Sequence, residues 1–252
     1  MNDVNALGII IEEHWLHTGV SNGGETMVIW IGYGSLARCL LSFKNKEVAV
    51  HIFNRDQEKI AKLPMAHKNV FTATSHEFSQ ADTVFVFLPA HVYREFFEKY
   101  RGCFKENATF YFFATALDRN EVSTIIGTDA IPAKFVGQAN QSHQDQKALL
   151  LLPKEKDISY FRSLFNKHVK LMVEEEKVAL VANQVATEYA LSFVKQLERE
   201  LTNQGIPQEI INHSIDITAR GVIKSYITNS LGHFGKQILE KIEVKQEVDD
   251  ET

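Results

Sequence analysis

The chain of 252 residues carries a formal net charge of -5 at pH 7, with 44% hydrophobic and 23% charged residues. These fractions are ordinary for a globular protein with a proper core, and a mildly acidic chain without a basic patch is not expected to bind nucleic acid. No apolar run approaches the roughly 18 residues of a membrane span, so no membrane association is expected. The two cysteines, Cys39 and Cys103, show neither ligand nor framework spacing, which predicts a reduced, cytoplasmic protein.

Residues 1–26 differ from the rest of the chain, because they mix polar residues with Gly23 and Gly24 and end directly before the first apolar run. They are expected to form a loosely ordered extension, and they lack the cationic and apolar regions of a secretory signal. His14 and His17 have a spacing that suits a metal ion on a helix. No Cys or carboxylate partner accompanies them, so no metal site is expected.

From residue 27 to residue 174, short apolar runs alternate with amphipathic segments. Strands are predicted at 28–31, 47–53, 70–71, 83–88, 109–113, 134–138, 148–152 and 168–173, and helices at 36–43, 57–63, 92–100 and 157–166. Strands that alternate with helices at this spacing form parallel βαβ units. The expected fold is α/β, with a Rossmann-type, doubly wound, mostly parallel sheet.

After residue 174 the chain has the pattern of helices. Residues 175–203 contain no proline or glycine and place apolar side chains near helical spacing. Gly205 and Pro207 interrupt this pattern, and residues 210–231 and 234–242 resume it. We predict an all-helical dimerisation or substrate domain over residues 175–243 and a solvated acidic tail over residues 244–252.

The sequence Ile-Gly-Tyr-Gly-Ser-Leu-Ala follows the first predicted strand and opens the first predicted helix. Gly32 can form the tight turn, Gly34 lets a pyrophosphate approach the backbone, and Ala37 keeps the helix close to the sheet. In this context Gly-x-Gly-x-x-Ala predicts dinucleotide binding at the helix N-terminus, rather than a turn with only a structural role.

The second strand ends in Asn54 and Arg55, where an NAD site usually has an acidic residue for the ribose hydroxyl. Arg55 can form charge-assisted hydrogen bonds to a 2′-phosphate, so NADP is favoured over NAD. The alternative is an exposed arginine paired with Asp56. A dinucleotide crosses the carboxyl ends of the strands, so the loops after the fourth and fifth predicted strands should flank it. The predicted cofactor residues are Gly32, Tyr33, Gly34, Ser35, Leu36, Asn54, Arg55, Phe87, Leu88, Pro89, Ala114 and Thr115.

The order of these features resembles the pyrroline-5-carboxylate reductase family. The matching stretches are I-G-Y-G-S-L-A, F-N-R-D-Q-E-K, A-D-T-V-F-V-F-L-P, A-K-F-V-G-Q-A-N and the long helix that ends in N-Q-G-I-P. The resemblance covers about residues 27 to 230. It implies an NADP-binding domain, a helical domain through which two chains pair, and an oxidoreductase acting on a small substrate.

The motifs that bind substrate in that family depart from the pattern. Of Arg-x-Met-Pro-Asn only Asn140 remains, and of Gly-Ser-Gly-Pro-Ala-Tyr only Tyr189 remains. The Pro-Gly-Gly-Thr-Thr loop, which wraps the substrate carboxylate in that family, has no counterpart here, so a carboxylate-binding nest is not expected.

Two functions fit the sequence. One is an oxidoreductase that transfers a hydride between NADPH and a small imine or carbonyl compound. The alternative is a non-catalytic NADP-binding regulator or redox sensor descended from the reductases. The sequence identifies no catalytic residue; the candidates are Asn140, His143 and Tyr189. His143 follows Asn140 on an expected polar loop, where a surface role is the alternative, and Tyr189 lies on the long helix, where a core role is the alternative.

The long helix also predicts a partner. Val178, Val181, Val185, Tyr189 and Phe193 alternate with small alanines, and this apolar surface is broader than one sheet edge requires. Such a surface pairs readily with its own copy about a twofold axis. We expect a homodimer built mainly from residues 178 to 230; the alternative is a monomer whose helices fold back on the α/β domain.

Overall fold

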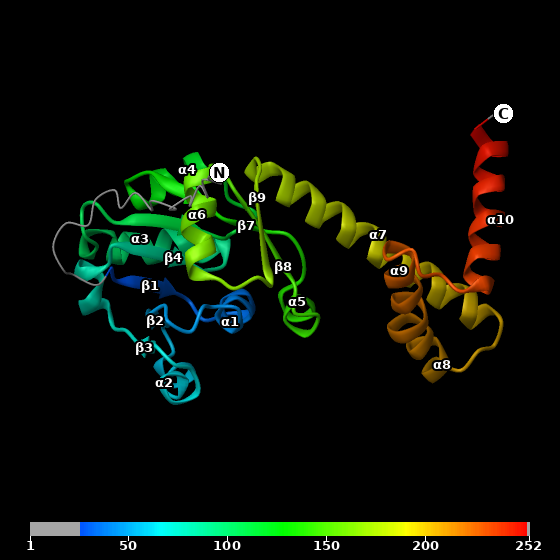
Figure 1. The fold of residues 1–252 in the computed structure, drawn as a ribbon, viewed down its shortest axis with the longest axis horizontal. Helices are drawn as coiled ribbons and strands as arrows, with labels where there is room; N and C mark the ends of the chain where they lie inside the picture. Colours follow the sequence, from blue (N-terminus) through cyan, green and yellow to red (C-terminus); the bar gives the residue numbers. More distant parts are fainter. Residues whose placement is uncertain (1–25, 251–252) are drawn as a thin grey trace, which may run out of the picture. The chain divides into compact units, whose positions relative to one another are not determined.

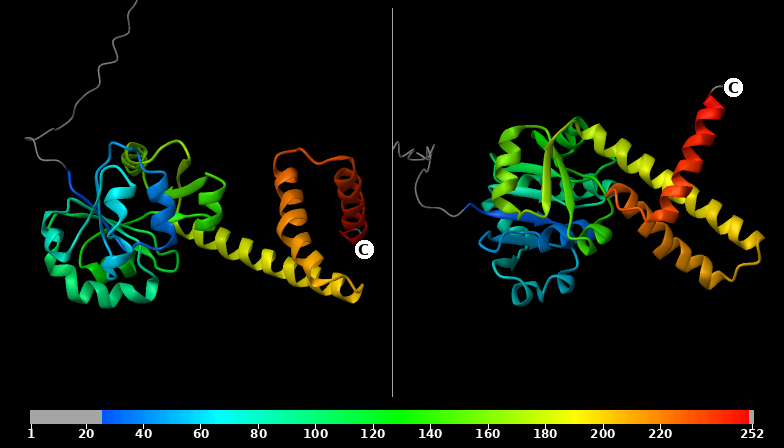
Figure 2. Two further views of the ribbon diagram at one scale, coloured as in Figure 1. Left: turned by 90° about the horizontal axis from the view of Figure 1, so that it is seen from below. Right: turned by 45° about the vertical axis from the view of Figure 1, so that its right-hand side comes forward.

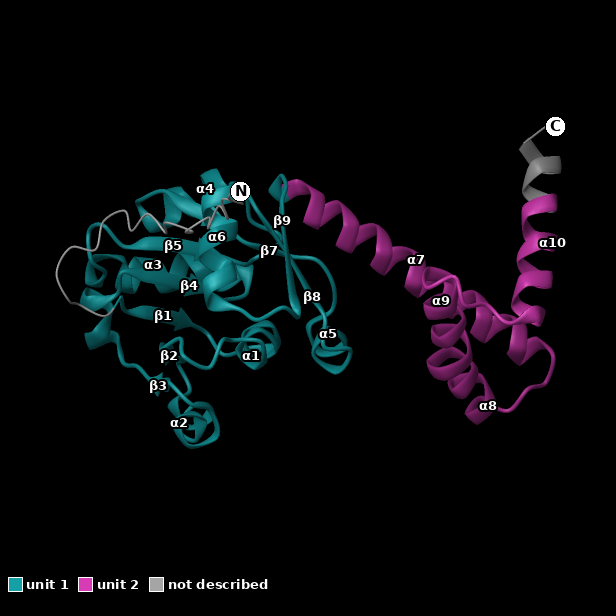
Figure 3. Ribbon diagram, viewed as in Figure 1, with its two compact units in different colours: residues 1–176 teal, residues 177–252 magenta. Residues whose placement is uncertain are grey.

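The computed structural model describes residues 26–250, with side chains described as far as residue 244 (Figure 1). The extension predicted over residues 1–26, with His14 and His17, therefore lies outside the described residues except for its last position. The chain divides into two compact units, with the boundary between Glu176 and Lys177 (Figure 3). The sequence placed this boundary near residue 174.

The first unit is built on a six-stranded sheet in the order β3-β2-β1-β4-β5-β6, and all of its neighbouring strands are parallel. Its strands are β1 (Val28–Ile31), β2 (Val50–Phe53), β3 (Val70–Thr72), β4 (Thr83–Val86), β5 (Thr109–Phe112) and β6 (Ala130–Pro132). The chain starts in the middle of the sheet, runs out to β3, and returns to the other side of β1. The predicted doubly wound α/β fold is confirmed.

Side chains that alternate along the strands build two separate cores, one on each face of the sheet. Trp30, Phe85 and Tyr111 belong to one core, which α1 (Ser35–Ser42) and α6 (Glu155–Leu164) cover. Ile29, Val84 and Phe110 belong to the other, which α3 (Tyr93–Tyr100) and α4 (Arg119–Ile126) cover. Because both faces are covered, the central strands β1 and β4 are buried at every position and almost wholly apolar, as buried parallel strands are.

The region after β5 departs from the prediction. The sixth strand of the main sheet is β6, and the segment predicted as a strand at 134–138 is only β7 (Lys134–Phe135). With Ala133 alone between them, β6 and β7 cannot be joined by the long crossover that parallel pairing requires. β7 instead pairs antiparallel with β8 (Ala148–Leu152), which pairs parallel with β9 (Val169–Val173).

Two predictions of local secondary structure also differ from the structure. The helix expected at 57–63 is a 3-10 turn (Gln57–Lys59) followed by the short α2 (Leu63–Ala66). Pro64 explains the break, because proline fits the first turn of a helix but not its interior. The polar segment after β7, expected to be a loop, forms α5 (Ala139–Gln144), which Gln138 caps by accepting a hydrogen bond from the Gln141 N–H. Further 3-10 turns cover Ser75–Gln80, Ala90–Val92 and Arg101–Cys103.

The second unit is helical, and its elements can be seen from two further sides in Figure 2. They are α7 (Glu176–Asn203, which begins at the last residue of the first unit), α8 (Gln208–His213), a π-helical turn (Ser214–Ala219), α9 (Arg220–Ile227) and α10 (His233–Asp250). Gly205, at φ +74°, ends α7 as predicted. The backbone of α10 continues to Asp250, so the helix extends through most of the predicted acidic tail, whose Glu and Lys residues favour helix. Within the described chain, no helix has both the length and the apolar character needed to cross a bilayer.

Candidate functional site

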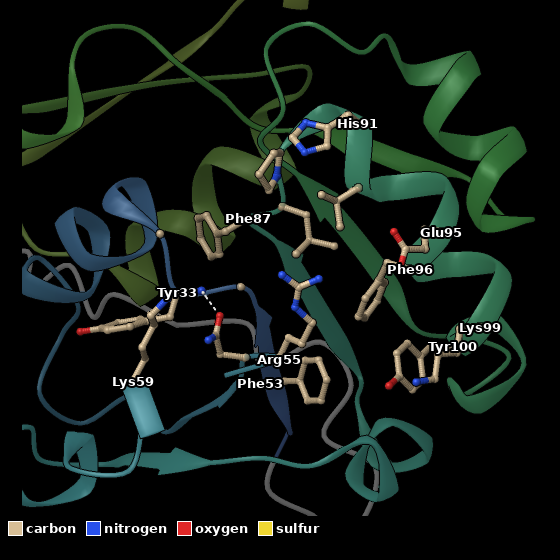
Figure 4. Close-up of a pocket in the computed structure, with 16 residues that line it drawn as sticks. Tyr33, Phe53, Arg55, Lys59, Phe87, His91, Glu95, Phe96, Lys99 and Tyr100 are labelled. Carbon is tan, nitrogen blue, oxygen red and sulfur yellow. Dashed lines mark hydrogen bonds between the residues drawn. The ribbon is translucent and has the colours of Figure 1, made fainter. Parts of the chain in front are cut away.

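A cleft of about 490 Å³ opens at the carboxyl ends of β1, β2 and β4 (Figure 4). This is the edge where the strand order reverses between β1 and β4, and doubly wound sheets bind ligands at such a point. The cleft is lined by Gly32, Tyr33, Gly34, Phe53, Asn54, Arg55, Lys59, Phe87, Leu88, Pro89, His91, Val92, Glu95, Phe96, Lys99 and Tyr100. Eight of the twelve predicted cofactor residues therefore line a single cleft.

The two glycines of the turn are glycine for different reasons. Gly32 has φ +93°, and a Cβ built on it would lie 3.0 Å from the backbone oxygen of Phe87, so the fold itself requires glycine there. Gly34 has an ordinary extended backbone, and a Cβ built on it would meet no protein atom within 4 Å. The protein leaves open space beside Gly34, which is the space that a closely approaching ligand would use.

Gly34 is also the N-cap of α1. It has no side chain to cap the helix, and the first turn of α1 carries no acidic residue. The first backbone N–H groups of α1 are therefore free to bind an anion, and the helix dipole adds a partial positive charge at the same end. Together with the open space beside Gly34, this end of the cleft suits a phosphate group.

Asn54 joins the two strands that border the cleft. Its Oδ1 accepts a hydrogen bond from the Tyr33 N–H at 3.3 Å, and its Nδ2 donates to the backbone oxygen of Asp56 at 2.8 Å. The Gly32 N–H donates to the backbone oxygen of Phe53 at 2.8 Å in the same place. Asn54 thus holds the glycine turn against the end of β2, where an aspartate oxygen could also accept from Tyr33.

Arg55 projects into the cleft rather than onto its neighbour. In Figure 4 its guanidinium lies in the middle of the cleft, with Tyr33 on one side and Phe96 on the other. Asp56, the alternative partner, pairs with Lys59 instead, at 3.4 Å. Among the described residues Arg55 has no ion pair, so its charge remains available to a ligand. An arginine in this state suits a phosphate, which it can bind through two parallel hydrogen bonds.

One wall of the cleft was not predicted. It comes from α3 and the turn before it, and it carries His91, Val92, Glu95, Phe96, Lys99 and Tyr100. The aromatic rings among them pack on Phe53, with ring centroids 6.0 Å away for Phe96 and 5.9 Å for Tyr100. The sequence does carry a signal for this wall, because these six residues form two rows at a spacing of four, which lie next to each other on one helical face.

The remaining predicted cofactor residues do not line this cleft. Ser35 lines a smaller hollow of about 350 Å³ between α1 and α5. Leu36 is half-buried against the first core, and Ala114 is half-buried against the second. Thr115 is half-buried in the loop after β5.

The hollow beside Ser35 also contains two of the candidate catalytic residues, Asn140 and His143. Both lie on α5, and the Nδ1 of His143 is 3.0 Å from the hydroxyl of Ser42 at the end of α1. Cys39 lines the same hollow, but burial raises the pKa of its thiol to about 11, so it stays protonated and unreactive near neutral pH. The third candidate, Tyr189, lies in the second unit and is 74% exposed.

No protein-family model matches the chain, and no curated protein sequence matches it. Its structure is similar to that of a pyrroline-5-carboxylate reductase from Coxiella burnetii, with a TM-score of 0.60 and 14% identity over 89% of each chain. A Streptococcus pyogenes 1-pyrroline-5-carboxylate reductase gives a TM-score of 0.57 at 16% identity, over 87% of this chain and 90% of the other. A Plasmodium falciparum pyrroline carboxylate reductase with NADP bound gives 0.56 at 12% identity, over 89% of this chain and 93% of the other. At these identities the likeness establishes a shared fold, which confirms the expected resemblance at that level.

Proposed function

We propose that the protein is an NADP-dependent oxidoreductase that transfers a hydride between NADPH and a small imine or carbonyl compound. The observation that carries the proposal is that one cleft combines open space at Gly34 with Arg55, which has no ion pair in the described chain. The open space suits a pyrophosphate and the arginine suits a 2′-phosphate. The NADP-bound Plasmodium reductase, which shares the fold, supports the same conclusion.

The cleft offers groups for each part of the adenosine half of NADP. The free N–H groups at the start of α1 would bind the pyrophosphate, and Arg55 would bind the 2′-phosphate. Phe96 and Tyr100 give an apolar wall against which an adenine ring could pack. When bound, NADPH would supply the hydride, and the protein would bind and orient the reactants.

The substrate is proposed only as a class. A small imine or carbonyl compound fits the fold shared with the reductases, while the missing Pro-Gly-Gly-Thr-Thr loop argues against pyrroline-5-carboxylate itself. Asn140 and His143, which share the hollow beside Ser35, remain the proposed groups for substrate handling in the first unit.

We also propose a cytoplasmic homodimer formed through the second unit. Between α7 and the π-helical turn with α9 lies an apolar groove of about 500 Å³, lined by Ala186, Tyr189, Ala190, Phe193, Val194, Ile215, Ala219, Arg220 and Ile223. Nearly all of its lining is apolar, so cover by another apolar helix would be favourable. A second copy of the same helices would provide that cover.

The test has two stages. NADPH and NADH are titrated into the protein while the nicotinamide fluorescence is monitored, and tighter binding of NADPH is expected. NADPH oxidation is then screened across cyclic imines, 2-oxo acids and aldehydes. Binding with turnover supports the oxidoreductase, binding without turnover of any of these classes supports the NADP-binding regulator instead, and no binding contradicts both.

A further inference from the structure

A buried lysine outside the cleft holds the loop that comes after β5. Lys134, at the start of β7, is only 1% exposed. Its Nζ donates to the backbone oxygens of Ala114 at 2.7 Å and Leu117 at 2.6 Å. It also lies 4.0 Å from the centre of the Phe112 ring, a cation–π contact at the end of β5. One ammonium group thus fixes both ends of the turn from residue 114 to residue 117.

Glu176 completes the arrangement from the end of the first unit. Its Oε2 lies 3.4 Å from the Nζ of Lys134, and its Oε1 accepts a hydrogen bond from the Arg119 N–H at 2.9 Å. Asp118 caps the same helix by accepting from the Glu121 N–H at 2.8 Å. The carboxylate of Glu176 therefore balances the buried charge and also binds the start of α4, so the loop is held at each side.

This loop lies where the second half of a dinucleotide should be. β5 pairs parallel with β4, so their carboxyl ends share one edge of the sheet, and the residues after β4 already line the cleft. A dinucleotide whose adenosine half occupies the cleft must continue past β4 toward β5. Lys134 binds the backbone oxygens of Ala114 and Leu117, and Ala116, which lies between these two residues in the chain, is exposed.

We propose that Lys134 and Glu176 are positioning residues for the nicotinamide half of the cofactor: they hold the 114–118 loop in the shape that receives that half. The proposal rests on the proposed function, because it takes NADP as the ligand of the cleft. It assigns a role to a charged pair that the cleft itself does not contain.

The test compares two ligands that share the adenosine 2′-phosphate end. NADPH has the nicotinamide half, and 2′,5′-ADP lacks it. Lys134→Met in the full chain should reduce the affinity for NADPH by about tenfold, the loss expected for about one charge-assisted hydrogen bond. The affinity of the same variant for 2′,5′-ADP should stay within about twofold of the wild-type value. Glu176→Gln should act in the same direction but more weakly, because its amide oxygen can still accept from Arg119. Lys105→Met, which removes the surface ion pair with Asp82, is the matched control and should change neither affinity.

A measurement on the wild type covers the case in which Lys134→Met does not fold. Burial lowers the pKa of Lys134 to about 8, and the charged groups that face it are Glu176 and Asp118. Raising the pH from 7 to 9 should therefore reduce the preference for NADPH over 2′,5′-ADP without any substitution. The inference would be overturned if the affinities for NADPH and 2′,5′-ADP fell equally, or if neither changed, both in the variants and across this pH range. If the wild-type protein binds NADPH and 2′,5′-ADP equally tightly, the positioning role is wrong but the proposed function stands. If the wild-type protein binds neither ligand, the proposed function is wrong as well.

Discussion

In the first unit nearly every large apolar side chain is buried or half-buried, whereas many of those on the described helices of the second unit are exposed. The described exceptions in the first unit are Met65, Phe71, Met172 and Val173. In the described part of the second unit, the buried apolar residues are only Ala179 and Ile211. The sheet has a core on each of its faces, whereas a helical unit of this size is near the lower limit at which a single core stabilises a domain. This difference is the reason that we place the proposed cofactor site in the first unit and the proposed dimer contact in the second.

The largest effect is expected from charging the apolar groove of the second unit. Phe193→Glu places a carboxylate among the groove residues, and the cost of burying it should abolish the homodimer. Light scattering at micromolar concentration should give about twice 28.7 kDa for the wild type and about 28.7 kDa for the variant. Gln196→Glu introduces the same charge at an exposed position of α7 outside the groove and should remain dimeric. A wild type near 28.7 kDa would contradict the dimer.

The next effect concerns the missing carboxylate-binding loop. We expect little or no turnover of pyrroline-5-carboxylate with NADPH, because the Pro-Gly-Gly-Thr-Thr loop is absent although the cleft proposed for the cofactor is present. The rate is measured by NADPH absorbance, with an NADPH titration of the same sample as the control for active protein. A kcat/KM above about 10⁴ M⁻¹s⁻¹, within the ordinary range of enzymes, would show that the loop comparison is misleading.

Within the cleft, Arg55→Ala should remove most of the preference for NADPH over NADH. One charge-assisted contact to a phosphate contributes on the order of 1.5–3 kcal/mol, which is roughly tenfold or more in affinity. Fluorescence titration with each cofactor measures the change. Arg94→Ala removes an exposed arginine of α3 that does not line the cleft and should leave both affinities unaltered. Identical curves for the two cofactors with the wild-type protein would contradict the proposed role of Arg55.

The two glycines should separate binding from folding. Gly34→Ser places a side chain in the open space of the cleft, so the affinity for NADPH should fall by about tenfold. The stability of the fold should be kept, since serine is a favourable N-cap. Gly32→Ser should destabilise the fold by about 1–2 kcal/mol or more, because its φ is +93° and its Cβ would crowd Phe87. Thermal unfolding and NADPH titration of both variants test this. If Gly34→Ser binds like the wild type, the space beside Gly34 is not a phosphate site.

The smallest effect is a pH dependence of stability. Burial lowers the pKa of Lys134 from 10.5 to about 8 in the folded chain, so between these values the unfolded state binds more protons. The free energy of unfolding should therefore rise with pH there, by roughly 1 kcal/mol from pH 8 to pH 9. Denaturant unfolding of the wild type and of Lys134→Met measures the difference, and the variant should lack this rise. Parallel pH curves for the two proteins would contradict the lowered pKa.

The sequence by itself determined the parts of the protein that depend on neighbouring residues. The apolar runs and the helices between them predicted the parallel βαβ order. The glycine turn predicted the open space at Gly34, and the end of β2 predicted an arginine, Arg55, that lines the same cleft. These features are set by spacing along a few residues, so a local pattern suffices to predict them.

The tertiary structure decided what depends on residues far apart in the chain. Whether a strand after β5 joins the main sheet or pairs with β8 depends on long-range pairing, so the sequence predicted a strand near Lys134 but not its partner. The wall that α3 adds to the cleft, and the contact of Lys134 with Glu176 across 42 positions, arise only when the strands come together. In the sequence, the residues of the α3 wall and the pair Lys134 and Glu176 cannot be told from other helix and strand residues. The burial of a side chain and the identity of its partner are properties of the packed fold and not of the local pattern.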